Sequence, residues 1–171
     1  MLHLFNHITT FVFDVDGVLT DGTLILLPGG EMARTMNIKD GYALQLAVKK
    51  GYHVVIISGG LSSLVQERLE KLGVKHLYMA VKDKRQVLIN WMEAHGVKAD
   101  QLLYMGDDVP DVAAMEIAGL PCCPADACVE VQAISRYISP LKGGAGCGRD
   151  VIEKVMRLQQ KWQITEGVSS R

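Results

Sequence analysis

An apolar run that ends abruptly in two carboxylates constrains this chain more than any other feature. Phe11, Val12 and Phe13 have the pattern of a buried strand, and Asp14 and Asp16 follow it directly. Gly17 comes next and allows the chain to turn, so the two acidic side chains frame one point just beyond the strand. One carboxylate can attack a substrate or bind a cation while the other transfers a proton. An isolated pair of this kind also fits a strand that simply runs into an aspartate turn.

Other polar residues follow later apolar runs in the same way. Runs at 54–57 and 102–105 each end in glycine and polar side chains, and a lysine opens a helical pattern between them. In a parallel α/β sheet the strand ends share one edge, where ligands bind. Such a set could hold a divalent cation, clamp an anion and present a nucleophile, as phosphoryl transfer requires. The residues are, in chain order, Ser58, Gly59, Lys84, Asp107, Asp108 and Asp111.

Strand and helix patterns alternate along the chain. Apolar spacing and glycine stops predict helices over 42–50, 61–72, 83–96, 109–118 and 149–162, and a further helix capped by Asp126. Strands are predicted over 52–58, 76–79, 102–106 and 136–139. The alternation predicts an α/β fold, a Rossmann-like three-layer sandwich with a mostly parallel central sheet. With 171 residues and no internal linker, we expect a single domain over 1–171 with a flexible tail at about 163–171.

One segment interrupts the alternation. Residues 23–36 have the pattern of two short strands around Pro28, Gly29 and Gly30, which predicts a β-hairpin directly after the first strand. The ribbon carries a large amount of apolar surface for a free hairpin, which favours its burial against other subunits. A solvent-exposed hairpin on a monomer is the alternative. The apolar residues are Leu24, Ile25, Leu26, Leu27 and Met32.

Charge and cysteine content narrow the class of partner. The net charge is −1 and no segment is basic or long and apolar, so we expect no nucleic-acid partner and no membrane partner. The opening residues lack the pattern of a signal peptide, which favours a cytoplasmic protein. Four cysteines without a CxxC pair predict reduced thiols, not a disulfide framework or a zinc site.

Taken in order, four motifs resemble the haloacid dehalogenase (HAD) superfamily of phosphotransferases. They are the DxDGVLT stretch from Asp14, the strand-end Ser58, Lys84 and the GDDxxD stretch from Gly106. The resemblance covers about 10–157. A receiver domain phosphorylated on aspartate uses similar residues, but it has no acidic cluster after its lysine and does not fit.

The resemblance implies a role for each motif residue. Asp14 is expected to form an aspartyl phosphate and Asp16 to act as acid and base. Mg²⁺ is expected on Asp14, the backbone carbonyl of Asp16 and Asp107, supported by the outer carboxylates Asp108 and Asp111. Phosphoryl oxygens are expected to bind Ser58, the Gly59 amide and Lys84. Two alternatives stay open: Lys84 as a solvated charge at a helix start, and Asp111 as an acid favoured by the helix dipole.

Within the superfamily the chain resembles members that carry a hairpin in place of a cap domain. Such members form tetramers in which the hairpins assemble and neighbouring subunits close the site, so we expect a homotetramer. The subfamily it resembles is that of 3-deoxy-D-manno-octulosonate 8-phosphate phosphatase. The resemblance places a substrate-contacting loop at Asn37, Ile38, Lys39, Asp40 and Gly41, and an arginine that faces the sugar acid at Arg68. The segment from Gly143 to Arg149 resembles the glycine-rich C-terminal segment of that group.

The chain departs from the subfamily in two segments. Gly60, Leu61, Ser62 and Ser63 are uncharged where relatives often carry cations, and Ala145 replaces a common arginine. We therefore expect a Mg²⁺-dependent phosphomonoester hydrolase that acts on a sugar-acid phosphate, with the eight-carbon 8-phosphate of lipopolysaccharide precursor synthesis as the implied substrate. The alternatives are a phosphatase for a nine-carbon, sialic-acid-type 9-phosphate and a non-catalytic module of sugar-nucleotide synthesis.

Overall fold

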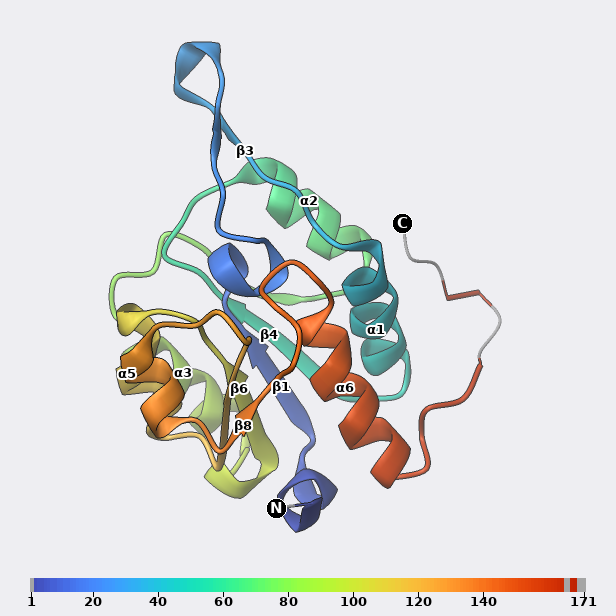
Figure 1. The fold of residues 1–171 in the computed structure, drawn as a ribbon. Helices are drawn as coiled ribbons and strands as arrows, with labels where there is room; N and C mark the ends of the chain where they lie inside the picture. The colour runs from blue at the N-terminus through green and yellow to red at the C-terminus, as the bar shows by residue number, and fades with distance from the viewer. Residues whose placement is uncertain (1, 165–166, 169–171) are drawn as a thin grey trace.

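A central sheet of six parallel strands organises the protein (Figure 1), whose computed structural model describes residues 2–164 and 167–168. The strands lie in the order β5-β4-β1-β6-β7-β8, so β1 lies between β4 and β6. Their bounds are β1 Thr10–Phe13, β4 His53–Ile57, β5 His76–Tyr78, β6 Leu102–Met105, β7 Leu120–Cys123 and β8 Tyr137–Ile138. The predicted parallel sheet is therefore confirmed.

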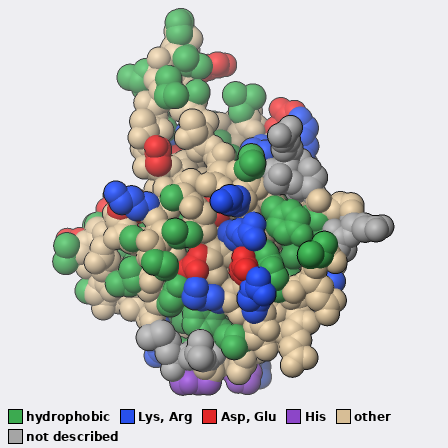
Figure 2. Space-filling model, turned by 45° about the vertical axis from the view of Figure 1, so that its right-hand side comes forward, with side chains coloured by type: hydrophobic (Ala, Val, Ile, Leu, Met, Phe, Trp, Pro, Cys, Tyr) green, Lys and Arg blue, Asp and Glu red, His purple; other side chains and the backbone are tan. Residues whose placement is uncertain are grey.

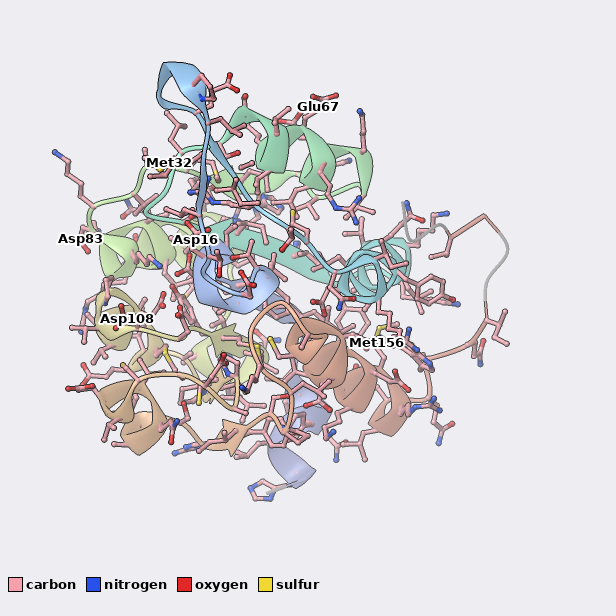
Figure 3. The ribbon with its side chains drawn as sticks, turned by 45° about the horizontal axis from the view of Figure 1, so that its top comes forward. Asp16, Met32, Glu67, Asp83, Asp108 and Met156 are labelled. Carbon is pink, nitrogen blue, oxygen red and sulfur yellow. The ribbon has the colours of Figure 1, made fainter. Side chains whose placement is uncertain are left out.

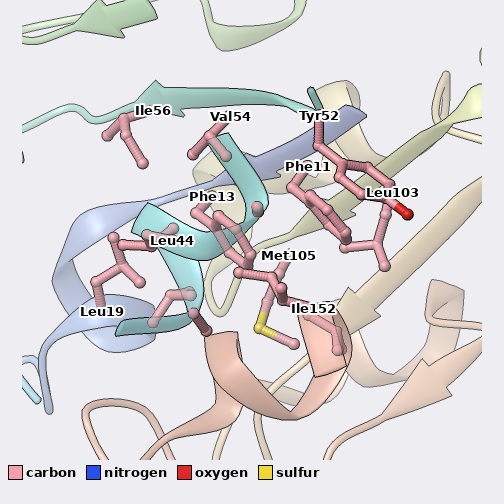
Figure 4. Packing of buried hydrophobic residues seen from close by; sticks show 14 of the residues in the cluster. Phe11, Phe13, Leu19, Leu44, Tyr52, Val54, Ile56, Leu103, Met105 and Ile152 are labelled. Carbon is pink, nitrogen blue, oxygen red and sulfur yellow. The ribbon is translucent and has the colours of Figure 1, made fainter. Parts of the chain in front are cut away.

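Helices cover both faces of the sheet because side chains alternate along each buried strand. Phe11 and Phe13 point into one hydrophobic cluster, where they pack with Leu44 and Ile152 (Figure 4), and Val12 points into the other. The first cluster includes side chains of α1 Ile38–Lys49, α2 Ser63–Lys71 and α6 Cys147–Leu158. The second includes side chains of α3 Lys84–His95, α4 Val112–Met115 and α5 Val129–Ile134. These two covered faces confirm the three-layer sandwich.

Local capping sets several helix ends where the sequence indicates them. Ser62 caps α2, since its side chain accepts a hydrogen bond from the Val65 amide at 3.4 Å. Asp83 caps α3 through the Gln86 amide at 2.9 Å, and α3 ends at Gly96 in the left-handed conformation. Lys84 is consequently the first residue of α3 and lies at the edge of the sheet where the predicted polar residues gather.

Several predicted boundaries are wrong. The first long helix begins at Ile38, not at residue 42, because Asn37 caps it through the Lys39 amide. The last helix runs over Cys147–Leu158 and starts earlier than 149. The 109–118 helix divides into the 3₁₀ turn η5 Val109–Asp111 and α4.

The sequence prediction also missed strand β7 and misplaced one cap. β7 has only four residues, one of them Pro121, and such a short apolar run carries little strand signal. Asp126 does not cap α5, which starts after Cys128. The Asp126 carboxylate instead accepts a hydrogen bond from the Gly143 amide at 2.9 Å. That bond ties the glycine-rich segment to the loop after β7.

The predicted hairpin is present and projects from the body of the protein (Figure 1). β2 Ile25–Leu26 pairs antiparallel with β3 Met32–Ala33 around the turn η3 Pro28–Gly30. Its apolar side chains lie in solvent in the single chain, and Figure 2 shows them gathered on the protruding ribbon. Leu26, the most exposed of them, has 76% of its surface accessible.

A tight turn follows β1 and is supported from the far end of the chain. The turn η2 Val15–Leu19 contains Gly17 at a φ of +84°, a conformation that favours glycine. Gly143 packs on this turn so closely that a Cβ there would lie 2.0 Å from the Gly17 carbonyl oxygen, and the Gly144 amide donates to Val18 at 2.9 Å. The glycine-rich segment therefore holds the turn that carries Asp16.

Within the described ranges, none of the helices combines the length and apolar character that a membrane crossing requires. Of the predicted tail, 165–166 and 169–171 lie outside the described residues.

Candidate active site

The carboxyl ends of β1, β4 and β6 meet around a cavity of about 300 Å³. The structure brings together there all the residues predicted for catalysis, metal binding and phosphate binding. The lining residues are Asp14, Asp16, Gly17, Gly22, Ser58, Gly59, Gly60, Lys84, Asp107, Asp108, Pro110 and Asp111. The parallel register explains this convergence, since β1 pairs with both neighbours and all three strands end at one edge.

Lys84 joins two carboxylates at the bottom of the cavity. Its Nζ lies 2.8 Å from Asp14 Oδ2 and 2.8 Å from Asp111 Oδ1. Asp111 also accepts hydrogen bonds from the Tyr104 hydroxyl at 2.9 Å and the Asp107 amide at 3.2 Å. Lys84 and Asp111 are both buried. Lys84 is therefore not a solvated charge, and Asp111 is more than an acid that the helix dipole favours.

Two carboxylates of this cluster, Asp14 and Asp107, are hard to ionise. Burial, together with the charge of Asp111, raises the pKa of Asp14 to about 6 although Lys84 opposes the shift. Burial and the neighbouring Asp14 raise the pKa of Asp107 to about 7. Burial alone would lower the pKa of Lys84, but Asp14 and Asp111 outweigh it and raise that pKa. One lysine thus faces several carboxylates, so the cluster has more carboxylates than cations to pair with them.

The donor set fits a hard divalent cation. Asp14, Asp107 and Asp111 each offer an oxygen, and these oxygens lie within 4.8 Å of one another. Asp111 is already engaged by three donors, whereas no hydrogen bond reaches the Asp107 carboxylate from the described residues. Carboxylate oxygens of this kind suit Mg²⁺. A Cβ at Gly17 would lie 1.8 Å from Asp107 Oδ2, so only glycine leaves room for this carboxylate.

Asp16 is held by an arginine that the sequence analysis missed. Arg34, which follows β3, places its Nε 2.6 Å from Asp16 Oδ1 and its Nη2 3.1 Å from Asp16 Oδ2. Figure 3 shows Asp16 in the turn below the hairpin strand that carries Met32. The hydroxyl of Thr20 accepts the Gly17 amide at 3.3 Å and the Gly22 amide at 3.2 Å, so this residue shapes the turn. No short motif links positions 16 and 34, and only the hairpin geometry could have indicated the pair.

Ser58 follows β4 directly and is buried beside the acidic residues. Its hydroxyl accepts the Gly60 amide at 3.2 Å, which folds the following segment over the cavity. Gly59 lines the cavity next to it. Asp108 is exposed at the rim and caps the turn η5 through the Val109 amide at 2.8 Å.

The predicted substrate-contacting loop has another conformation. Asn37 is the cap of α1 and Ile38, Lys39, Asp40 and Gly41 form its first turn, so the prediction of a loop is wrong. Asp40 is buried and accepts the Arg149 amide of α6 at 2.7 Å, and burial raises its pKa to about 6. None of these residues lines the cavity of a single chain. Their contact with substrate stays a prediction.

Arg68 lies in the last turn of α2 and does not line the cavity either. The single chain therefore leaves the expected sugar-acid contacts outside the acidic site.

Known proteins resemble this chain in sequence and in fold. No family model matches the chain. The 3-deoxy-D-manno-octulosonate 8-phosphate phosphatase KdsC of Escherichia coli K12 is 32% identical over 164 residues, which cover 96% of this chain and 87% of that protein. The crystal structure of 3-deoxy-D-manno-octulosonate 8-phosphate phosphatase from Moraxella catarrhalis, in complex with magnesium ion, phosphate ion and KDO, has a TM-score of 0.90 at 32% identity, with 94% and 92% of the two chains covered. The Yersinia pestis phosphatase has a TM-score of 0.92 at 29% identity, with coverage of 99% and 90%.

The fold and the cavity define a phosphatase of the HAD superfamily, and a putative HAD subfamily III A hydrolase from Legionella pneumophila shares the fold with a TM-score of 0.90 at 30% identity. Its relatives in sequence and structure show that the chain belongs to the 3-deoxy-D-manno-octulosonate 8-phosphate phosphatase family. The family predicted from the four motifs is confirmed, and so is the class of enzyme.

Asp107→Asn is expected to stabilise the metal-free protein at pH 8. The folded-state pKa of Asp107 is raised from 3.8 to about 7. The neutral carboxyl therefore stabilises the folded wild type fully below pH 4, and this contribution is lost as the pH rises through 7. In excess chelator the variant should melt about 2–4 °C above the wild type at pH 8, and the difference should vanish near pH 4. Millimolar Mg²⁺ should raise the melting temperature of the wild type only.

Asp21→Asn is the matched control, because Asp21 is exposed, lies outside the cavity lining and accepts the nearby Thr23 amide, which asparagine can also do. This variant should have the melting temperature of the wild type in chelator and the same rise in melting temperature with Mg²⁺. A less stable Asp107→Asn protein at pH 8 in chelator would contradict the charge imbalance described above.

Proposed function

We propose that this protein is a Mg²⁺-dependent phosphatase that hydrolyses 3-deoxy-D-manno-octulosonate 8-phosphate in the cytoplasm, as a step of lipopolysaccharide precursor synthesis. The observation that carries the proposal is the buried Asp14, bridged to Lys84 and adjacent to the uncompensated Asp107. The Moraxella catarrhalis relative, solved with magnesium ion, phosphate ion and KDO, supports the substrate class. The cytoplasmic location stays a prediction.

Asp14 is assigned as the nucleophile. Its carboxylate oxygen forms a bond to phosphorus as the bond from phosphorus to the sugar oxygen breaks, which gives an aspartyl phosphate. Asp16 gives its proton to the leaving sugar oxygen, then takes a proton from the water that attacks phosphorus, and this second step restores Asp14.

The remaining residues bind charge. Ser58, the Gly59 amide and Lys84 hold the phosphoryl oxygens where charge grows toward the transition state. Asp14, Asp107 and the backbone carbonyl of Asp16 would hold Mg²⁺, which when bound neutralises that charge and orients the phosphoryl group. Asp108 and Asp111 support these ligands, and Asp111 does so through Lys84 and the Asp107 amide.

The sugar-acid contacts are assigned to an assembly. Arg68 and the first turn of α1 lie outside the cavity of one chain, so we assign them to contacts completed by a neighbouring subunit in a homotetramer. The exposed hairpin supports this assembly, and so does a groove of about 410 Å³ between the hairpin and α2, lined by Leu27, Met32, Leu61 and Leu64 among others.

Asp14→Asn is expected to abolish phosphate release, because an amide of nearly the same shape is a poor nucleophile. With Mg²⁺, the wild type should release phosphate from 3-deoxy-D-manno-octulosonate 8-phosphate, faster than from a nine-carbon sugar-acid 9-phosphate. Chelator should stop the reaction and added Mg²⁺ restore it. Turnover should fall by roughly 10³-fold or more in the variant.

Asp21→Asn is the matched control, since Asp21 is exposed and only bonds the nearby Thr23 amide. It should retain wild-type turnover. Normal activity of Asp14→Asn, or full activity in excess chelator, would remove Asp14 or the metal from the mechanism.

Replacing Leu24 and Leu26 with Asp is expected to dissociate the tetramer, because the charges cannot be buried between hairpins. Light scattering should show tetramers for the wild type and smaller species for the variant, with lower activity on the sugar-acid phosphate. The matched control replaces Leu158 and Val129, whose exposures of 40% and 78% resemble the 40% and 76% of Leu24 and Leu26. A fully active wild-type monomer at micromolar concentration would refute the assembly.

A further inference from the structure

Arg34 lies between the acidic cavity and the groove beside the hairpin. Ala33, which precedes it, lines the groove, and Gly60, which its guanidinium approaches, lines the cavity. A molecule whose phosphate occupies the cavity and whose other end extends into the groove therefore passes this guanidinium. The Arg34 side chain is only 6% exposed, and hydrogen bonds to Asp16 and to the Met32 carbonyl hold its guanidinium in place.

The ion pair of Arg34 engages both oxygens of Asp16. Nε and Nη2 each donate to one oxygen, at 2.6 and 3.1 Å, and Nη1 donates to the Met32 carbonyl at 3.1 Å. This two-pronged geometry is the strongest that arginine forms with a carboxylate. A carboxylate held in this way is oriented toward the guanidinium, and it has to leave that orientation to exchange a proton with a leaving oxygen.

Few other cations are available for an anionic substrate at this place. Among the described residues that line the cavity and the groove, Lys84 is the one cation, and it is already bound to Asp14 and Asp111. The groove contributes the carboxylate of Glu31, which repels an anion. The segment from Gly60 to Ser63 is uncharged. Arg34 is the cation that remains for a second negative group.

Glycine at position 60 makes room for the pair. A Cβ there would lie 2.9 Å from Asp16 Oδ2 and 3.1 Å from Arg34 Nη2. A larger side chain at this position would displace the guanidinium from its present place. The loop after β4 and the residue after β3 are therefore matched to each other.

We propose that Arg34 is a specificity-determining residue that exchanges Asp16 for a carboxylate of the substrate. A sugar phosphate with a carboxylate takes over the guanidinium, and the released Asp16 carboxylate takes up a proton from water and turns toward the leaving oxygen, to which it gives that proton. A phosphate ester without a second anionic group leaves the Asp16 pair closed and reacts slowly. The inference rests on the proposed function and adds the residue that selects acidic substrates.

The test compares two substrates in Arg34→Gln, with 3-deoxy-D-manno-octulosonate 8-phosphate as the acid and p-nitrophenyl phosphate as the ester without a carboxylate. The variant should lose about 10- to 100-fold in kcat/KM on the acid, the loss of a charge-assisted pair. It should gain about 2- to 5-fold on p-nitrophenyl phosphate, because Asp16 is no longer held. Arg34→Lys keeps the charge without the fork and should recover part of the activity on the acid.

Arg157→Gln is the matched control, since Arg157 forms an ion pair at 2.7 Å with Glu153 far along α6. This variant should have the wild-type kcat/KM on both substrates. Equal losses on both substrates in folded Arg34→Gln protein, or no change on either, would overturn the proposed exchange while leaving the phosphatase assignment intact. Absence of phosphate release by the wild type from both substrates with Mg²⁺ would overturn the proposed function as well.

Discussion

The bridge that Lys84 makes between Asp14 and Asp111 is the interaction on which the rest of the site depends. Three buried charges are costly to remove from water, and they are tolerated because each is paired and hydrogen-bonded. Tyr104 and the Asp107 amide complete the shell of Asp111, which fixes the lysine and through it the nucleophile. The nearby carboxylate of Asp107 has no such partner among the described residues, and this imbalance makes the cavity a site for a cation.

Backbone packing at glycines allows these groups to come close. Gly17 leaves space for the Asp107 carboxylate, and Gly106 leaves space for Asp111, whose Cβ would lie 2.4 Å from an added Cβ. The glycine-rich segment near the C-terminus then packs on the turn after β1. The hairpin contributes Arg34 to the same turn, so a segment that carries exposed apolar side chains for assembly also holds Asp16.

The parallel fold and the acidic cavity were predictable because their signals are local. Asp14, Ser58, Lys84 and Asp107 each follow or open a regular element, and parallel strands place such ends at one edge. Arg34 was not predictable in this way, because its partner Asp16 is 18 residues away and depends on the course of a hairpin. Asn37 to Gly41 resembled a loop, yet the Asn37 cap extends α1 through them. Strand β7 was too short to give a period, and Asp126 bonds a distant glycine instead of capping a helix.

The most direct test of the central claim is to trap the covalent intermediate. Wild-type protein mixed with Mg²⁺ and 3-deoxy-D-manno-octulosonate 8-phosphate is quenched in acid within one turnover, reduced with borohydride and digested for mass spectrometry. The account predicts that reduction converts one aspartate to homoserine, at position 14, and that the modification is absent without substrate or Mg²⁺. Modification of Asp16, Asp107 or Asp108 instead, in protein that releases phosphate, would contradict the assignment of Asp14 as the nucleophile.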